Sequence, residues 1–338
     1  MLSVMTAALL MWTQLACTET ASSIAADSSG EHWTDTADGV EYPDTGDTGA
    51  ADFAVPEFPY LLSFHTCPSD KEPCGNPLNH SVRLAGSDDG FNWNLLDWVE
   101  PFMGSVPDVL VRDGILYLYS LPELRRIDLA TQEVLSGSVL TFQSEETIFH
   151  ADPSMILDEE GRIVMFFLEG AEGIDPASCP EKPCTKRILS ATEEPGSLGT
   201  EFSIDEGARL EIEITEDGPA RVSDPDIFAT DSGYSMLISR GQSVRVYHSD
   251  ELRGSFETLI KDNLTPGTGG VPAGEQIDGE FWLYFSVDED GGFNSEIQWI
   301  VLDDLAQVLA EDALTPISVS PALDVDTIMG SPGFWAVE

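Results

Sequence analysis

Residues 107–120 read PDVLVRDGILYLYS, which is a proline, a short apolar strand, an Asp-Gly turn and a second apolar strand. Three later segments repeat this order: PSMILDEEGRIVMFF from Pro153, PDIFATDSGYSMLIS from Pro225 and PAGEQIDGEFWLYFS from Pro272. In each copy a turn glycine follows the proline by seven or eight residues, and an acidic residue stands just before the turn. This pattern predicts one β-hairpin per copy.

The spacing of the copies predicts the architecture. The intervals from proline to proline are 46, 72 and 47 residues, and a period in the forties with a hairpin at each start is typical of propeller blades. The stretch 303–312, DDLAQVLAED, is the best helical candidate, and it is short. We therefore expect an all-β fold.

A fifth copy, SPGFWAV at 331–337, stops after one strand. Residues 60–64 and 81–93 read as strands without a preceding proline, so they are candidates for the missing outer strands. The prediction is a five-bladed β-propeller over residues 54–338, with blade one closed by both termini, which removes an exposed sheet edge. Ser87–Trp93 resembles the Asp-box turn of sialidase-type propellers, one residue short, and such turns are structural.

The N-terminal residues indicate export. Residues 1–16 carry no charged side chain and contain an apolar run that is too short to span a bilayer, as in a signal peptide. Leu15-Ala16-Cys17 resembles a bacterial lipoprotein cleavage site, so we predict a signal peptide over 1–17 with lipidation of Cys17. The predicted location is the bacterial cell envelope or surface. The alternative is plain secretion after cleavage near Ala16 or within Ala21–Ala26.

Residues 18–53 contain nine acidic residues, no Lys or Arg, and few large apolar groups. Such a segment cannot bury enough surface to offset its chain entropy, so it is predicted to be a flexible acidic linker.

Four of the five cysteines fall in two similar short loops, CPSDKEPC at 67–74 and CPEKPC at 179–184. In an exported protein this pattern favours two local disulfides, Cys67–Cys74 and Cys179–Cys184. A four-thiolate zinc site is the alternative, but its spacers are usually shorter.

The charge balance excludes several partners. The 338 residues contain 61 Asp plus Glu against 15 Lys plus Arg, a net charge of −46. Nucleic acid is not expected as a partner, because phosphate binding needs clustered cations. Contact with a membrane is expected only through a lipid anchor. The chain is expected to be a monomer.

In a propeller the innermost strands line a central channel, and the template proline marks where each of these strands begins. The residues beside the prolines therefore form the candidate site: Asp108, His150, Asp152, Asp224, Asp226 and, three after Pro272, Glu275. Carboxylates around one funnel suit acid–base work on a glycosidic bond, binding of a hard cation such as calcium, or binding of sugar hydroxyls. Each Asp beside a proline also has a purely structural interpretation, as the cap of a turn.

Two of these segments, Val106-Pro-Asp108-Val and His150-Ala-Asp152-Pro-Ser, resemble inner-strand motifs of five-bladed glycosidases. These are the arabinanases and β-xylosidases of glycoside hydrolase family 43 and their invertase and levansucrase relatives. The resemblance covers roughly residues 100–300. It implies that Asp152 tunes the pKa of the catalytic acid, and that Asp108 is a base or a substrate ligand.

The chain also departs from that family. The acid Glu is expected in a Glu-Gly-Pro or Glu-Ala-Pro motif on the next blade, where this chain has Ser223-Asp224-Pro225-Asp226. Glu275 is a possible substitute, although it lies inside its strand.

The leading hypothesis is a polysaccharide hydrolase with Asp108, Asp152, Asp226 and Glu275 as catalytic residues and His150 and Asp224 as substrate ligands. The alternative is a non-catalytic glycan-binding or structural surface lipoprotein.

Overall fold

A computed structural model of the chain describes residues 56–68, 79–143, 149–170, 177–179, 181–215, 221–241, 243–265, 269–288, 295–307, 309–310, 313–323 and 327–337. The predicted signal peptide, Cys17 and the acidic linker lie outside these residues. Among the described residues no helix is long and apolar enough to cross a membrane. The helical candidate 303–312 is irregular where it is described, with a turn in which the Gln307 amide donates to the Asp304 carbonyl.

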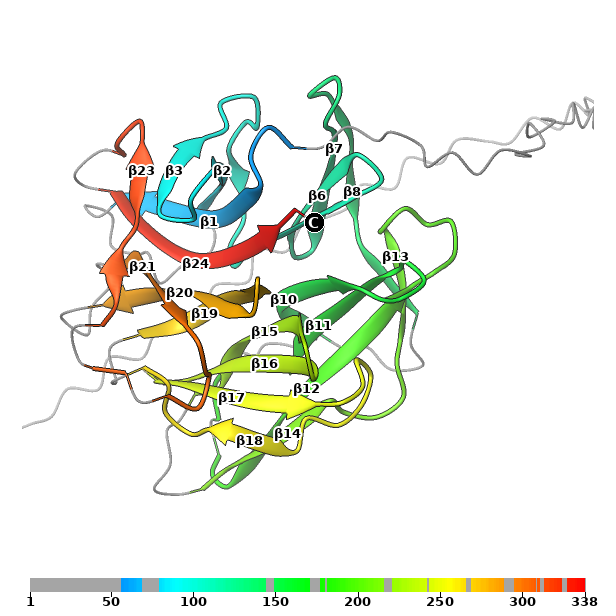
Figure 1. Cartoon of the computed structure of the whole chain (residues 1–338). Coiled ribbons are helices and arrows are strands. Elements are labelled where there is room, and N and C mark those ends of the chain that lie inside the picture. Colours follow the sequence, from blue (N-terminus) through cyan, green and yellow to red (C-terminus); the bar gives the residue numbers. More distant parts are fainter. Residues whose placement is uncertain are drawn as a thin grey trace, which may run out of the picture. The chain divides into compact units, whose positions relative to one another are not determined.

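The strands form five sheets, each a blade of a five-bladed β-propeller, as predicted (Figure 1). Blade 2 contains, from the centre outward, β5 (Asp108–Arg112), β6 (Ile115–Ser120), β7 (Glu123–Asp128) and β8 (Val134–Val139). Blade 4 contains β15 (Ser223–Thr230), β16 (Gly233–Arg240), β17 (Ser243–Ser249) and β18 (Thr258–Lys261). Blade 5 contains β19 (Gly269–Ile277), β20 (Glu280–Asp288), β21 (Ser295–Leu302) and β22 (Thr315–Pro316).

Blade 3 is larger because its third strand pairs with two others. It contains β10 (Phe149–Leu157), β11 (Ile163–Gly170), β12 (Cys184–Glu193), β13 (Glu201–Ile204) and β14 (Leu210–Ile214). A further strand, β9 (Thr141–Gln143), follows blade 2 in the chain but pairs in parallel with β13.

Blade 1 is assembled from both ends of the domain. It contains β24 (Thr327–Ala336), β1 (Tyr60–Pro68), β2 (Ser81–Ser87) and β3 (Asn92–Leu95), with β4 (Phe102–Met103) and β23 (Ser318–Ser320) attached. β24 pairs with β1 along its length, and Figure 1 shows the two side by side, red against blue. The predicted closure of blade one by both termini is therefore confirmed.

The hairpins of the repeat form as the sequence predicts. Asp113 and Gly114 both have positive φ, as do Asp278 and Gly279, which is the conformation of a type I′ hairpin turn. The Asp-box turn is structural: the Asp89 carboxylate accepts the amides of Phe91 and Asn92, and these hydrogen bonds lower the pKa of Asp89 to about 2.

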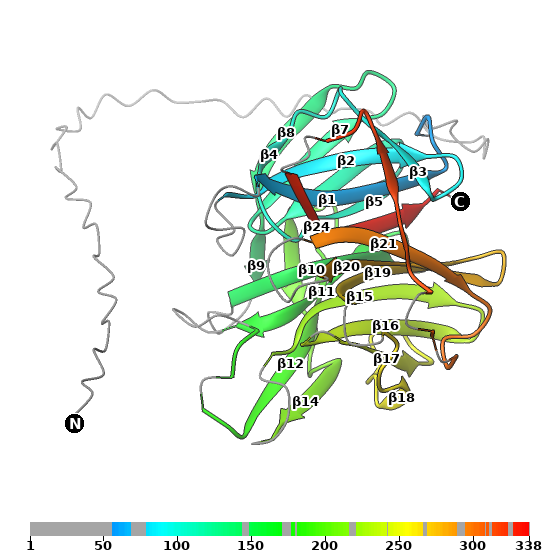
Figure 2. The same cartoon turned by 90° about the vertical axis from the view of Figure 1, so that its left-hand side faces the viewer.

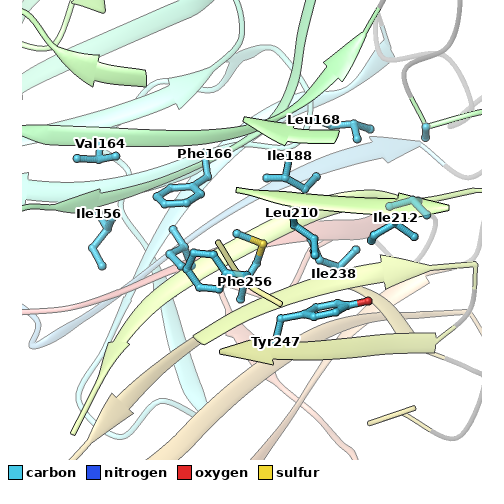
Figure 3. Close-up of a cluster of buried hydrophobic side chains, with 14 of the residues drawn as sticks. Ile156, Val164, Phe166, Leu168, Ile188, Leu210, Ile212, Ile238, Tyr247 and Phe256 are labelled. Atoms are coloured by element: carbon cyan, nitrogen blue, oxygen red, sulfur yellow. The ribbon is translucent and has the colours of Figure 1, made fainter. Parts of the chain in front are cut away.

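The hydrophobic core lies between the blades. Five clusters of buried side chains each fill the gap between two neighbouring blades. Figure 3 shows the cluster between blades 3 and 4, where Phe166 of β11 packs edge-on against Phe256. Because each sheet buries both faces against its neighbours, the inner strands β5, β10, β15, β19 and β24 are held around one axis (Figure 2).

Candidate functional site

In every blade, a residue with positive φ stands directly before the template proline of the inner strand. The five residues that precede the template prolines all have φ between 45° and 54°: Val106, Asp152, Asp224, Val271 and Ser331. Positive φ is unusual for any residue other than glycine and rare for a β-branched one. The strand ladder shifts register at four of these positions, between Ala151 and Ser154, Ser223 and Pro225, Gly270 and Pro272, and Gly330 and Gly333. A proline lacks an amide hydrogen and therefore fits such a bulge.

The prolines close the channel. All five line one space on the axis, together with Val106, Asp108, Asp224, Asp226, Val271 and Gly333. This space is only about 10 Å³ among the described residues, which is room for one water at most. A sugar ring does not fit there.

In blades 2, 3 and 4, the side chain of the residue after the proline accepts a hydrogen bond from the next blade. Asp108 Oδ2 accepts the Met155 amide at 2.7 Å, and Ser154 Oγ accepts the Ile227 amide at 3.0 Å. Asp226 Oδ2 accepts the Gly274 amide at 2.8 Å. In all three cases the donor lies two residues after the next blade's proline. The same side chain position therefore links blades 2, 3, 4 and 5 in series.

In blades 5 and 1 the residues after the proline are Ala273 and Gly333, and neither has a side chain that can accept a hydrogen bond. A Cβ at Gly333 would lie 2.6 Å from Asp108 Oδ1 and 2.7 Å from the Pro107 carbonyl oxygen. Glycine is needed there because the backbone approaches blade 2 so closely.

The environment of the two buried carboxyls favours their neutral forms. Burial raises the pKa of Asp108 to about 7, against the opposing effect of the Met155 and Val109 amides. Burial and the nearby Asp108 charge raise the pKa of Asp226 well above its ordinary value. Asp108 and Asp226 are 5% and 8% exposed, so a ligand in the solvent does not reach them.

Asp152 and Asp224 lie where the inner strands enter the channel, which we call the mouth, and Asp224 also lines the axial space. Both are half-buried, and they occupy the positive-φ position on the neighbouring blades 3 and 4. The Asp224 amide donates to Asp152 Oδ2 at 3.2 Å. At the equivalent places, the Val271 amide donates to Ser239 Oγ at 2.6 Å and the Ser331 amide to Ser286 Oγ at 2.8 Å. Asp152 thus anchors the next blade, as the two serines do, and brings a charged group to the mouth.

Two predicted site residues do not line the axial space. Glu275 is half-buried in β19 opposite Trp282 of β20. The His150 ring stacks on Phe142 with centroids 3.7 Å apart and meets Phe167 edge-on. Burial lowers the pKa of His150 to about 4, so the imidazole is neutral at pH 7.

The structure therefore brings together Asp108, Asp224 and Asp226 on the axis, with Asp152 against Asp224, and leaves His150 and Glu275 apart. Reasoning from the sequence did not assign the inter-blade roles of Ser154, Ser239 and Ser286. For Ser154 a signal was present, since it occupies the template position held by Asp108 and Asp226.

A larger cavity, of about 310 Å³, lies between blades 3 and 4 at the ends of the strands that face away from the mouth. Asp158, Tyr234 and Arg253 are among its lining residues, and Asp158 accepts hydrogen bonds from Arg162 and Arg253. Across the described part of the chain, no three His, Cys, Asp or Glu side chains are placed to hold a metal ion. Calcium binding stays a prediction.

The predicted Cys179–Cys184 disulfide is present. Cys67 is also disulfide-bonded, while Cys74 lies outside the described residues. The strand ends that carry Cys67 and Cys184 both lie on the side of the propeller where the inner strands begin.

No protein-family model and no curated protein matches the sequence. Solved structures with a similar fold include the native arabinanase of Bacillus subtilis, at 13% identity over 63% of this chain and 76% of that one, with a TM-score of 0.47. An α-L-arabinanase mutant of Cellvibrio cellulosa is 15% identical over 72% of this chain and 89% of that one, with a TM-score of 0.45. A family 117 glycoside hydrolase of Zobellia galactanivorans is 19% identical over 56% and 61%, with a TM-score of 0.40.

The chain is thus a five-bladed β-propeller, a class that its five sheets define directly. The solved structures named above carry the names of arabinanases and of a family 117 glycoside hydrolase.

Proposed function

We propose that this protein is an exported propeller that binds a carbohydrate across the mouth of its channel, at Asp152 and Asp224, and does not hydrolyse it. One observation supports this function over hydrolysis: the axial space is about 10 Å³, and two of its three carboxyls, Asp108 and Asp226, are buried and hydrogen-bonded to backbone amides of the next blade. A glycosidase needs two carboxyl groups in reach of one glycosidic bond.

Asp152 and Asp224 suit recognition of a polyol. Each is half-buried, and the hydrogen bond from the Asp224 amide to Asp152 Oδ2 sets the two residues side by side. Ionised carboxylates accept hydrogen bonds only, and sugar hydroxyls are donors that match them. Because both residues lie within inner strands, β10 and β15, the pair is organised before a ligand arrives.

Glycan binding by the purified chain tests the proposal, with arabinan, xylan and levan as first ligands because the sequence motifs resemble enzymes for these polymers. Asp224→Asn is expected to weaken binding roughly tenfold or more, since a hydrogen bond to a charged group is lost. The matched control is Asp88→Asn, the same change at an exposed Asp in the hairpin turn between β2 and β3, which is expected to bind normally.

Reducing-end release is measured on the same samples. Sugar release that disappears in Asp152→Asn and persists in Asp88→Asn would establish a hydrolase and overturn the non-catalytic proposal. Absence of binding to every polymer would leave a structural surface protein.

We further propose that the chain is lipid-anchored at Cys17. The apolar residues 1–16, the Leu15-Ala16-Cys17 site and the Cys179–Cys184 disulfide support an oxidising compartment outside the cytosol. Cys17→Ser is expected to abolish incorporation of a labelled fatty acid and to move the protein from the membrane fraction to the soluble fraction. Equal labelling of Cys17→Ser would contradict the anchor.

A further inference from the structure

Strand β8 ends the sheet of blade 2 and, within the described residues, pairs only with β7. Its outer edge therefore presents backbone amides and carbonyls that are free to pair with another strand. Three of its side chains are large, apolar and exposed: Val134 at 52%, Leu135 at 50% and Val139 at 70%. An uncovered apolar edge strand is a place where another chain can add a strand.

The outer edges of blades 3, 4 and 5 carry features that discourage pairing, although β18 of blade 4 also exposes Leu259 and Ile260. β14 turns the exposed Glu211 and Glu213 outward, β18 ends in Lys261, and β22 is two residues long and contains Pro316. Charge, proline and shortness each discourage edge pairing. The segment 134–140, VLSGSVL, has no charge and no proline in a chain with 61 acidic residues.

The order of residues in this segment favours a second copy of the same chain as the partner. Read outward from Gly137, both directions give a serine and then an apolar residue: Ser136 and Leu135 on one side, Ser138 and Val139 on the other. Two such strands placed antiparallel around a two-fold axis set like against like, and this is the self-complementarity that a symmetric dimer requires.

We propose that β8 pairs antiparallel with β8 of a second copy, with the two-fold axis at Gly137. Gly137 then lies opposite Gly137, and Leu135 lies opposite Val139. A bulge in the β7–β8 ladder at the Val134–Leu135 end confines the regular pairing to about five residues. A strand pair this short buries less than the roughly 1,000 Å² of a stable interface, so the dimer is expected to be weak and concentration-dependent. Because both copies are strongly acidic, salt is expected to strengthen it.

Cysteine cross-linking in the full chain tests the register. In a Cys17→Ser background, Gly137→Cys is expected to form a disulfide-linked dimer under mild oxidation, because the two thiols meet at the axis. Val134→Cys is the matched control: in this register the two copies of residue 134 are separated by six residues of strand, roughly 20 Å. Equal cross-linking of the two variants, or none in Gly137→Cys, would overturn the proposal.

Sedimentation velocity tests the surface without new thiols. The double variant Leu135→Lys/Val139→Lys places like charges opposite each other and is expected to raise the dimer dissociation constant roughly tenfold or more. The control is Leu259→Lys/Ile260→Lys, which makes the same change at two exposed positions of β18. A wild-type chain that stays monomeric at every concentration and salt level, or a dimer insensitive to the β8 change, refutes the proposed surface.

Discussion

At the scale of single residues, position relative to the proline decides what a carboxyl does. Asp224 and Asp226 flank Pro225, yet the first is half-buried at the mouth and the second is 8% exposed beneath it. Asp226 accepts the Gly274 amide of the next blade, whereas the Asp224 amide donates to Asp152 of the preceding blade. Two aspartates that are two residues apart therefore have different environments, because the strand buries Asp226 and leaves Asp224 half-exposed.

Asp108→Asn is expected to flatten the pH dependence of folding stability between about pH 4 and pH 7. The pKa of Asp108 is raised to about 7 in the folded protein, while the unfolded chain ionises near its ordinary value of about 4. The folded state therefore binds more protons in this window, and stability falls as the pH rises through it. Urea unfolding followed by tryptophan fluorescence at several pH values measures the slope.

Absolute stability is not the readout for this variant, because the asparagine also changes the hydrogen bond to Met155. Asp88→Asn, at an exposed position, is expected to keep the wild-type slope. An unchanged slope in Asp108→Asn would show that this carboxyl is ionised in the folded protein.

Ser154→Ala is expected to lower the free energy of unfolding by about 1–3 kcal/mol, because the buried Ile227 amide loses its acceptor. The Ser154 hydroxyl also lies 3.4 Å from Asp226 Oδ1. Ser318→Ala, at an exposed serine of β23, is expected to stay within about 0.5 kcal/mol of wild type. Equal effects of the two changes would mean that the Ser154 bond does not hold blades 3 and 4 together.

At the scale of elements, β24 holds the first and last parts of the domain together. It supplies the inner strand of blade 1, and its Phe334 packs against Trp93 of β3 and Tyr284 of β20. Without β24, blade 1 loses its inner strand, and blades 2 and 5 lose the side chains of β24 that pack against them.

A chain that ends at residue 326 is therefore expected to lose cooperative unfolding and native tryptophan fluorescence. Adding a synthetic peptide of residues 327–338 is expected to restore both, because β1 retains its partner edge. A chain that ends after Ala336 keeps the whole strand and is the control. Native-like unfolding of the chain that ends at 326 would contradict a closing role for β24.

Two short strands cross from one blade to the next. β9 follows blade 2 but pairs with β13 of blade 3, and β23 follows blade 5 but pairs with β3 of blade 1, both in parallel. The repeat pattern did not predict them, because three-residue strands carry too little periodicity to stand out.

At the scale of the whole molecule, acidic residues far outnumber basic ones. With 61 acidic against 15 basic residues, repulsion between carboxylates opposes the compact state at neutral pH. The melting temperature is therefore expected to rise when NaCl screens these charges.

Calorimetry in low and high NaCl measures this effect. Sodium chloride is preferred to sulfate, because sulfate also strengthens apolar burial. A melting temperature that falls steadily as NaCl is added would contradict net repulsion as a main electrostatic influence on stability.

The blade count, the hairpins and the closure by both termini were predictable from the sequence, because each depends on a local pattern. Proline, strand, Asp-Gly turn and strand recur within short segments, and the fifth copy at Ser331–Val337 visibly lacks its partners. Local backbone preferences and alternating burial are sufficient to define such units.

The choice of which carboxyls a ligand can reach depends on tertiary contacts. The positive φ of Val106 and Val271, the closed ring of prolines and the approach of Gly333 to Asp108 all depend on blades far apart in the chain. The exposure and pKa of a side chain are set by its neighbours in space. Asp108 and Asp226 are therefore parts of the inter-blade framework, while Asp152 and Asp224 remain at the mouth.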